Sequence, residues 1–174
     1  MLGPLLTFSV TVSTMQHLNI DVPSDPGVYV LVIEVSQNLH IRVKSGKVFS
    51  LESGIYIYVG SALKGLRSRL RRYIEKKFYR KHWHIDYLLD CEGVNIRKII
   101  FSIVLHWEGE RPEVVLSRSI SQLDVVPVRG FGCTDLGRKV VANLYRSNMG
   151  IDIVDHVVRL MKTLFGNVYE ISIG

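Results

Sequence analysis

Cysteine and long apolar runs are the two features that this chain lacks most clearly. Its 174 residues contain two cysteines, Cys91 and Cys133, with neither metal-ligand spacing nor the density of a secreted disulfide scaffold. No apolar run approaches the roughly eighteen residues that a membrane span needs. Residues 1–14 lack a basic leader and a small-residue cleavage pattern, which predicts an edge strand or a loose terminus rather than a secretory signal. We therefore expect a cytoplasmic protein with no membrane association.

The composition is 47% hydrophobic and 22% charged, which is ordinary for a globular protein. A chain of this length buries roughly two thirds of its unfolded surface without disulfide or metal crosslinks. It shows no internal repeat and no low-complexity linker. We expect a single domain over residues 1–174.

Acidic residues are scarce in one segment, residues 64–81, where Glu75 is the only one. The segment has a net charge of +8 within a chain of +6, so the rest of the chain sums to 6 − 8 = −2. Basicity confined to one segment favours binding of a polyanion, although a solvated helix face would also explain it. The nine basic residues of the segment are Lys64, Arg67, Arg69, Arg71, Arg72, Lys76, Lys77, Arg80 and Lys81.

The first half of the chain reads as strands followed by helices. Residues 27–33 and 55–59 are rich in β-branched and aromatic residues and predict two strands, the second ending at Gly60 with Tyr56 and Tyr58 on one face. Residues 40–43 and 47–51 predict a hairpin that turns at Ser45-Gly46. Apolar residues recur at helical spacing from about residue 64 to 79, and a shorter helix is expected over 84–89.

The second half contains a strand over 94–105, a helix from Pro112 to about 122, and an irregular loop over 126–132. A helix over 151–164 and a strand over 168–173 complete the pattern. Strands and helices do not alternate strictly, so the predicted fold class is α+β: a small mixed or antiparallel sheet with a hairpin insertion, flanked by helices.

Three motifs in this order carry a resemblance to a known superfamily. Gly27-Val28-Tyr29 on one strand, Tyr58-Val59-Gly60 on another and Leu66 to Leu70 on the next helix together resemble the GIY-YIG nucleases. Residues 83–89 and 130–132 resemble a mainly archaeal branch of unassigned function, sometimes fused to endonuclease III. The resemblance covers residues 26–135 and leaves 136–174 as a C-terminal helical and strand extension. The literal string Gly54-Ile55-Tyr56 lies inside the second motif's strand, so we assign the motif tyrosines to Tyr29 and Tyr58 and the motif glycines to Gly27 and Gly60.

This resemblance implies a metal-dependent endonuclease that hydrolyses DNA phosphodiester bonds in repair or processing. In that family one motif tyrosine helps to activate the nucleophile, an arginine contacts the phosphate and a glutamate holds one divalent ion. By position these roles fall to Tyr29 or Tyr58, to Arg69 and to Glu113, with Mg²⁺ or Mn²⁺ as the metal. DNA is the expected partner, a repair protein is a further one, and no small-molecule cofactor is expected.

Residue positions support these assignments and leave alternatives. Arg69 lies about 100° of helical arc from the centre of the apolar stripe, on the side expected to face Tyr58, and Arg67 on the opposite border is the alternative. Glu113 shares the stripe that faces the sheet, although a glutamate in the first turn of a helix is also favoured by the helix dipole alone. His84 resembles a residue of the branch signature and is our fourth catalytic candidate, because an imidazole titrates near neutrality; a local structural role is the alternative.

Two departures from the family pattern bear on catalysis. Ser61 stands where many repair members have lysine, and Tyr73 stands one turn after the arginine, where many homing-type members have histidine. A non-catalytic nucleic-acid-binding module and a protein-binding scaffold therefore remain alternatives. No helix-turn-helix or zinc finger is present, so the contacts are expected to be with phosphates and the selectivity with DNA structure. The predicted phosphate-binding residues are Arg67, Arg71, Arg72, Lys76, Lys77 and Arg80.

Overall fold

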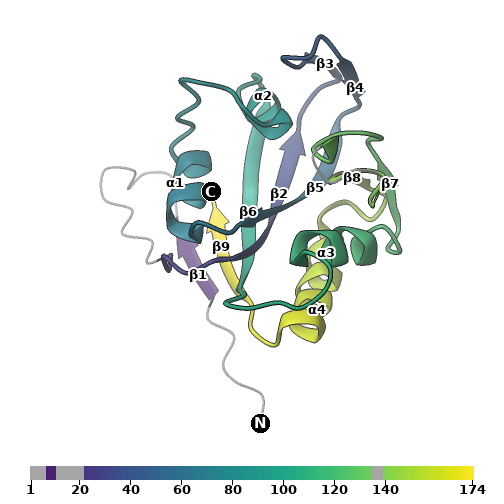
Figure 1. Ribbon diagram of the computed structural model, residues 1–174. Coiled ribbons are helices and arrows are strands. Elements are labelled where there is room, and N and C mark those ends of the chain that lie inside the picture. The colour runs from purple at the N-terminus through teal and green to yellow at the C-terminus, as the bar shows by residue number, and fades with distance from the viewer. Residues whose placement is uncertain (1–6, 11–21, 135–138) are drawn as a thin grey trace.

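A seven-stranded sheet forms the centre of the computed structural model, which describes residues 7–10, 22–134 and 139–174 (Figure 1). The strand order is β1-β9-β6-β2-β5-β8-β7. Every neighbouring pair is antiparallel except β1 and β9, which are parallel. The strands of this sheet are β1 (Thr7–Val10), β2 (Gly27–Val35), β5 (Gly54–Ala62), β6 (Val94–Ile103), β7 (Val125–Pro127), β8 (Leu144–Ser147) and β9 (Tyr169–Ile173).

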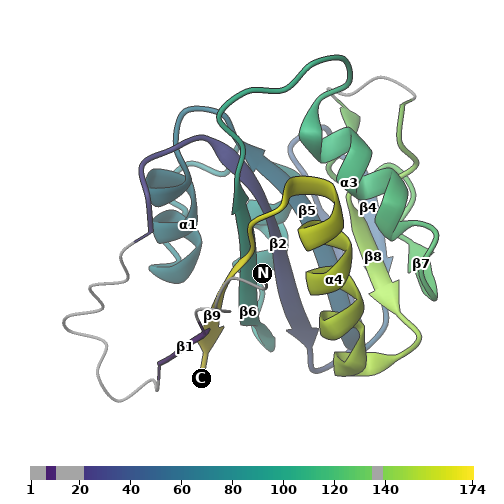
Figure 2. The ribbon, with the colours of Figure 1, turned by 90° about the horizontal axis from the view of Figure 1, so that it is seen from below.

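Helices cover both faces of this sheet. Helices α1 (Leu66–Ile74) and α2 (His84–Leu89) pack on one face, which we call the α1 face. Helices α3 (Pro112–Ile120) and α4 (Ile153–Phe165), the latter preceded by the 3-10 turn η3 (Gly150–Asp152), pack on the other, which we call the α4 face (Figure 2). This layering confirms the predicted α+β fold class. None of the helices in the described part of the chain is long and apolar enough to cross a membrane.

Alternation along β2 and β5 decides which side chains meet which helices. Both strands are buried on both faces, and successive side chains point to opposite sides. Tyr29 and Tyr58 therefore lie on the α1 face, whereas Val28 and Val59 pack on the α4 face. This confirms the predicted separation of tyrosines from aliphatic residues on β5.

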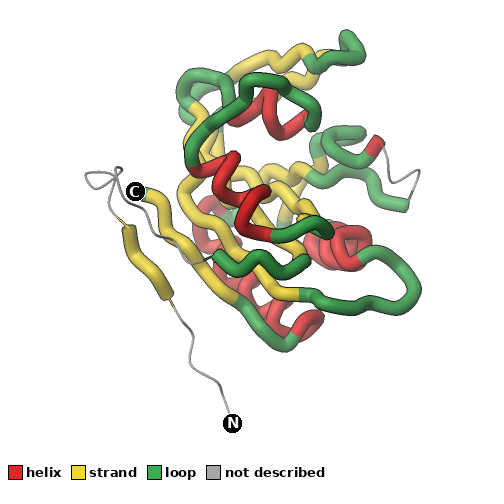
Figure 3. The backbone as a smooth tube through the Cα atoms, turned by 60° about the vertical axis from the view of Figure 1, so that its left-hand side comes forward, coloured by secondary structure: helices red, strands yellow, loops and turns green. Residues whose placement is uncertain are grey.

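The predicted hairpin is present and forms a separate two-stranded sheet from β3 (Leu39–Arg42) and β4 (Val48–Leu51). It lies beside α2 at one end of the molecule (Figure 3). Ile41, Phe49 and Leu51 are buried in the core of the α1 face. The hairpin is thus packed against that face rather than projecting freely from it.

Helix α1 is shorter than predicted, because it ends at Ile74 and not near residue 79. Lys76 adopts a positive φ of 47°, and the Lys76 and Lys77 N–H groups donate to the carbonyls of Tyr73 and Arg72. This pair of hydrogen bonds is a Schellman motif, which ends a helix and usually has glycine at the positive-φ position. Phe78, which fits the helical spacing, is buried from the following turn instead.

Three further expectations are corrected by sheet pairing. Strand β5 does not end at Gly60 but continues to Ala62, because β2 pairs with it along that whole length. The segment 126–132 is not wholly irregular, since β7 pairs with β8 at the edge of the sheet, a position that tolerates Pro127. No element is predicted between residues 136 and 150, yet β8 lies there.

The C-terminal extension is part of the same sheet. Strand β8 pairs with β5, β9 pairs with β6, and α4 covers the α4 face through Ile153, Val157 and Met161. The C-terminal extension therefore contributes two strands and one long helix to the core that also contains the motif residues.

Candidate functional site

Three predicted site residues, Tyr29, Tyr58 and Arg69, meet on the α1 face, and Tyr73 joins them there. The hydroxyls of Tyr29 on β2 and Tyr73 on α1 are 2.9 Å apart, and their rings lie 5.8 Å apart between centroids. The Arg69 guanidinium hydrogen-bonds Tyr73 and interacts electrostatically with Tyr29 and Tyr58. It also lies 5.3 Å from the centre of the Trp83 ring, which holds it from the α2 side. Arg69 is thus a half-buried cation set among three tyrosines.

Burial sets the protonation states in this cluster. It raises the pKa of Tyr29 well above its ordinary value and raises the pKa of Tyr73, while the Arg69 cation opposes both shifts. Burial alone would lower the pKa of Arg69, but the neighbouring tyrosine hydroxyls raise it overall. At neutral pH, Tyr29 and Tyr73 are therefore neutral hydroxyls beside a permanent cation. They can donate or accept hydrogen bonds, but they do not provide a phenolate base.

The two motif glycines are required by close packing. A Cβ on Gly60 would overlap the ring and hydroxyl of Tyr29, the residue that pairs with Gly60 on the neighbouring strand β2. A Cβ on Gly27 would overlap the Ser102 carbonyl and the Leu66 side chain at the start of α1. The absence of a side chain at Gly60 thus leaves room for the Tyr29 ring, and its absence at Gly27 leaves room for the start of the helix that carries Arg69.

Tyr58 and His84 are joined through the loop that follows β7. Phe131 packs edge-on against both, with centroid distances of 6.4 Å to Tyr58 and 5.4 Å to His84. The Gly132 N–H donates to His84 Nδ1 at 3.0 Å. Phe49 of the hairpin lies 5.3 Å from the His84 ring. His84 therefore contacts the same phenylalanine as Tyr58 and is oriented by the backbone of the Gly130-Phe131-Gly132 motif.

Glu113 lies in the first turn of α3, on a helix of the α4 face. Its side chain is only 4% exposed and forms an ion pair with Arg111, while its Oε2 has no hydrogen-bond partner. Residues 131–133 connect the surroundings of Tyr58 with those of Glu113. Gly132 adjoins the Tyr58 ring, and Cys133 packs with Val114, the residue next to Glu113. The structure thus gathers Tyr29, Tyr58, Arg69 and His84 on one face and places Glu113 at the start of a helix on the other.

The unpaired Glu113 oxygen fits a magnesium-like ion in one respect. Mg²⁺ keeps several waters and is commonly held by one or two carboxylates, so a single buried carboxylate with a free oxygen is a sufficient protein ligand. In the described part of the chain no three His, Cys, Asp or Glu side chains form a group that could hold an ion. Arg111 already neutralises Glu113, so a cation bound there would have to displace this ion pair or share the carboxylate with it.

The alternative candidates Arg67 and Tyr56 have different contacts from Arg69 and Tyr29. Arg67 donates from Nε to the Val22 carbonyl at 2.7 Å, away from the tyrosine cluster that Arg69 joins. Tyr56 donates to the Glu52 carbonyl at 2.8 Å, near the opposite end of β5 from Gly60. The geometry therefore favours Arg69 over Arg67 and Tyr29 over Tyr56.

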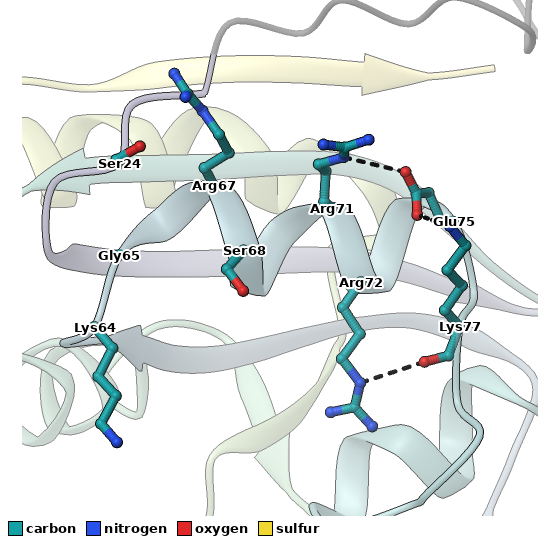
Figure 4. A pocket seen from close by; sticks show the side chains of 9 residues that line it. All are labelled: Ser24, Lys64, Gly65, Arg67, Ser68, Arg71, Arg72, Glu75 and Lys77. Atoms are coloured by element: carbon teal, nitrogen blue, oxygen red, sulfur yellow. Dashed lines mark hydrogen bonds and ion pairs between the residues drawn. The ribbon is translucent and has the colours of Figure 1, made fainter.

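A basic groove of about 460 Å³ runs beside α1 (Figure 4). Arg71 and Lys77, two predicted phosphate-binding residues, line it and share Glu75 as an ion-pair partner at the surface. Exposed pairs of this kind contribute little to stability, so phosphate can replace the carboxylate at low cost. The groove is lined by Ser24, Lys64, Gly65, Arg67, Ser68, Arg71, Arg72, Glu75 and Lys77.

Three other predicted phosphate-binding residues have different surroundings. Arg72 donates to the buried Asp86 carboxylate at 2.8 Å and to the carbonyls of Lys77 and Arg80, so it crosslinks α1 to α2. Lys76 donates to the Val94 carbonyl at 3.0 Å. These contacts favour structural roles for Arg72 and Lys76, whereas the Arg80 side chain is exposed.

Tyr73 is the residue that was not among the predicted site residues. Its sequence signal is its place four residues after Arg69, which puts both side chains on neighbouring turns of one helix face. The same spacing also fits an ordinary core aromatic on an apolar stripe. Only the contact with Tyr29 on another element separates the two interpretations.

Comparison with known proteins gives one match. A family described as a domain of unknown function, DUF123, matches residues 28–165. Neither the curated proteins nor the solved structures contain a significant match.

Proposed function

We propose that this chain, which belongs to the DUF123 family of domains of unknown function, is a metal-dependent DNA endonuclease of the GIY-YIG type. The observation that carries the proposal is the position of Arg69 among Tyr29, Tyr58 and Tyr73. A half-buried cation held among hydroxyl groups is suited to the negative charge that develops on a phosphate during hydrolysis.

Each residue of the cluster has a distinct part. Arg69 contacts a phosphoryl oxygen, and Tyr73 together with Trp83 fixes the direction of its guanidinium. Tyr29 is fully buried and positions Tyr73 through their shared hydrogen bond. Tyr58 and His84 both pack against Phe131, and in this proposal these two side chains orient the attacking water.

Glu113 would hold the divalent ion, Mg²⁺ or Mn²⁺, through the oxygen that has no hydrogen-bond partner. Such an ion would supply activation of water at neutral pH and neutralisation of phosphate charge. Because Glu113 lies on a helix of the α4 face, this role requires the ion to reach the Arg69 cluster past residues 131–133, which adjoin both Tyr58 and Val114. DNA is held by the basic groove beside α1, whose cations contact the backbone and carry no sequence information. A role in repair, a repair-protein partner and a cytoplasmic location remain predictions that accompany this proposal.

A nicking assay tests this function directly. Supercoiled plasmid and branched duplexes are incubated with the protein and Mg²⁺ or Mn²⁺, and EDTA serves as the blank. We expect divalent-ion-dependent nicking by the parent and loss of Mn²⁺ binding and nicking in Glu113→Gln, because an amide keeps the size but not the charge of the ligand. Glu110→Gln is the matched control, since Glu110 is exposed and pairs with Arg118 nearby. Equal nicking by Glu113→Gln and the parent would remove the proposed metal site.

A non-catalytic DNA-binding module is the second candidate. The ion pair between Arg111 and Glu113 favours it, because the only carboxylate assigned to the metal already has a cation. The two candidates predict the same salt-sensitive binding in EDTA but differ in nicking. Salt-sensitive binding without metal-dependent nicking by any preparation would select the binding module, and absence of both would favour a protein-binding scaffold.

A further inference from the structure

Tyr79 is an aromatic side chain held outward by an ordered loop. Tyr79 is 91% exposed, more than any other large hydrophobic residue in the described part of the chain. The residue before it, Phe78, is buried in the core of the α1 face. The carbonyls of Lys77 and Arg80, on either side, both accept hydrogen bonds from Arg72. The backbone of Tyr79 is therefore fixed at both sides while its ring stands in solvent.

The surroundings of Tyr79 are strongly basic. Residues 76–81 contain two lysines before the phenylalanine and tyrosine and an arginine and a lysine after them, with no acidic residue. Lys77 pairs with Glu75, and Lys81 pairs with Asp90. Lys77 and Arg72 also line the basic groove beside α1, so the same arginine that fixes the Tyr79 loop forms a wall of that groove. The loop that carries the exposed ring is thus bonded, through Arg72, to a wall of the groove.

An exposed aromatic ring beside a cationic groove has a specific chemical use. Proteins that bind single-stranded nucleic acid hold the phosphates in a positively charged groove and stack unpaired bases on aromatic side chains. Singly exposed apolar residues are common and need no ligand. Tyr79 differs in that a groove-lining arginine donates hydrogen bonds to the backbone on either side of it, and in the four basic residues that flank it in the sequence. A paired base inside a duplex offers no free face to this ring.

We propose that Tyr79 stacks on an unpaired base of DNA whose phosphates follow the basic groove, so that the substrate class is DNA with single-stranded nucleotides. This inference rests on the proposed action on nucleic acid and names the substrate of that same site. It also gives a physical cause for structure selectivity. Duplex alone fills the groove, whereas a frayed, flapped or gapped strand fills the groove and covers the ring.

Fluorescence anisotropy with the full chain in EDTA tests the inference without any cleavage. The probes are labelled oligothymidylate of about twelve nucleotides, within the length that one such site covers, and a blunt duplex. We expect Tyr79→Ala to weaken single-strand binding about 5- to 140-fold, the effect associated with one stacked base. Binding of the duplex should stay within about twofold of the parent, because groove contacts with phosphate are unchanged.

Two variants control for the ring and for folding. Tyr79→Phe keeps the stacking face and should bind both probes like the parent. Trp107→Ala removes an exposed aromatic residue, 40% exposed, from a loop with Glu108 and Glu110, and should also leave both probes unaffected. Unlabelled oligouridylate should compete with the single-strand probe if the ring reads the unpaired base, whichever sugar carries it.

The outcomes separate this inference from the nuclease proposal. Equal single-strand binding by Tyr79→Ala and the parent would overturn it, as would an equal weakening on both probes or failure of the parent to prefer single strands. A selective weakening supports it even if no preparation cleaves DNA, in which case the nuclease proposal alone is rejected. Metal-dependent cleavage with no Tyr79 effect would reject the stacking site and leave the nuclease proposal intact.

Discussion

The two faces of the sheet bury tyrosines in different ways. On the α4 face the Tyr145 hydroxyl lies 2.6 Å from the Ala142 carbonyl and 2.7 Å from Ser117 Oγ, which itself donates to Ala142. On the α1 face Tyr29 and Tyr73 share one hydrogen bond and lie beside the Arg69 cation. Both arrangements are buried, but only the second includes a charge.

This contrast distinguishes structural from functional polar groups. A buried hydroxyl with neutral backbone partners stabilises the fold and has no capacity left for a ligand. A guanidinium presents five N–H donors and is costly to bury, so one held among hydroxyls retains binding capacity for an anion. The α1 face is therefore where we propose that a phosphate binds, and the four predictions below compare it with the α4 face.

The largest effect is expected for Arg69→Ala. If the chain is a nuclease, removal of a preorganised cation next to developing negative charge should lower the nicking rate on the order of 10²–10³-fold. Ground-state DNA affinity should fall far less, because the cations of the groove remain. Single-turnover nicking rates and binding isotherms, measured on the same preparation, check both statements.

Arg159→Ala on α4 is the matched arginine control. Arg159 is exposed on the α4 face and donates to the Asp155 carbonyl of its own helix. We expect its nicking rate to equal that of the parent. Equal slowing by the two substitutions would mean that the contrast between the faces has no catalytic meaning.

The second prediction concerns salt dependence. Removal of two groove cations in Lys64→Ala/Arg71→Ala should flatten the plot of log affinity against log salt by about 1.8, at roughly 0.9 for each phosphate that is no longer neutralised. Arg159→Ala/Lys162→Ala removes the same charge from α4 and should leave the slope unchanged. Filter binding across a salt series measures both, and identical slopes for the two double variants would place the DNA elsewhere.

A smaller change is expected on stability for Tyr145→Phe. The ring still fills its site, but Ser117 Oγ and the Ala142 carbonyl lose a partner, which should lower the free energy of unfolding by about 1–2 kcal/mol. Nicking by the folded fraction should not change. Urea unfolding measures the loss of stability, and the nicking assay measures the activity. Slower nicking under conditions in which the variant is fully folded would contradict the prediction.

The last prediction concerns alkaline pH. Burial raises the pKa of Tyr29 and of Tyr73, so the folded protein keeps their protons to higher pH than the unfolded chain does. The free energy of unfolding is therefore unaffected by these groups below about pH 10 and falls as the pH rises above it, by up to about 1.4 kcal/mol per pH unit for each group. Urea unfolding at about pH 8 and about pH 11 should show the decrease.

Two substitutions identify the source of that decrease. Tyr29→Phe should reduce the dependence on pH, because one late-titrating hydroxyl is gone. Tyr79→Phe removes an exposed hydroxyl and should leave the dependence as in the parent. An unchanged decrease in Tyr29→Phe would assign the effect to other groups.

Local sequence patterns determined most of the secondary structure. Pro112 marked the start of α3, the turn at Gly46 marked the hairpin, and α2 lies over the residues expected for it. Alternation on β5 placed Tyr58 opposite the aliphatic residues. These features depend on neighbours in the chain, which is why the sequence reveals them.

Contacts between distant segments decided what the sequence did not. The end of α1 depends on Lys76 in a positive φ, which its side-chain contact with Val94 helps to hold, and β8 forms because the open edge of β5 accepts it. Neither pairing leaves a periodic signal in the short segment concerned.

The candidate site likewise has features that the sequence reveals and features that only the tertiary structure reveals. The order of the glycine and tyrosine motifs and the basic helix was readable from the sequence, and so was the preference for Arg69. The hydrogen bond of Tyr73 to Tyr29, the ion pair of Glu113 with Arg111 and the exposure of Tyr79 needed the tertiary structure. A residue type and its spacing fix which groups a face can present, but burial and partners come from packing against segments that are remote in the chain.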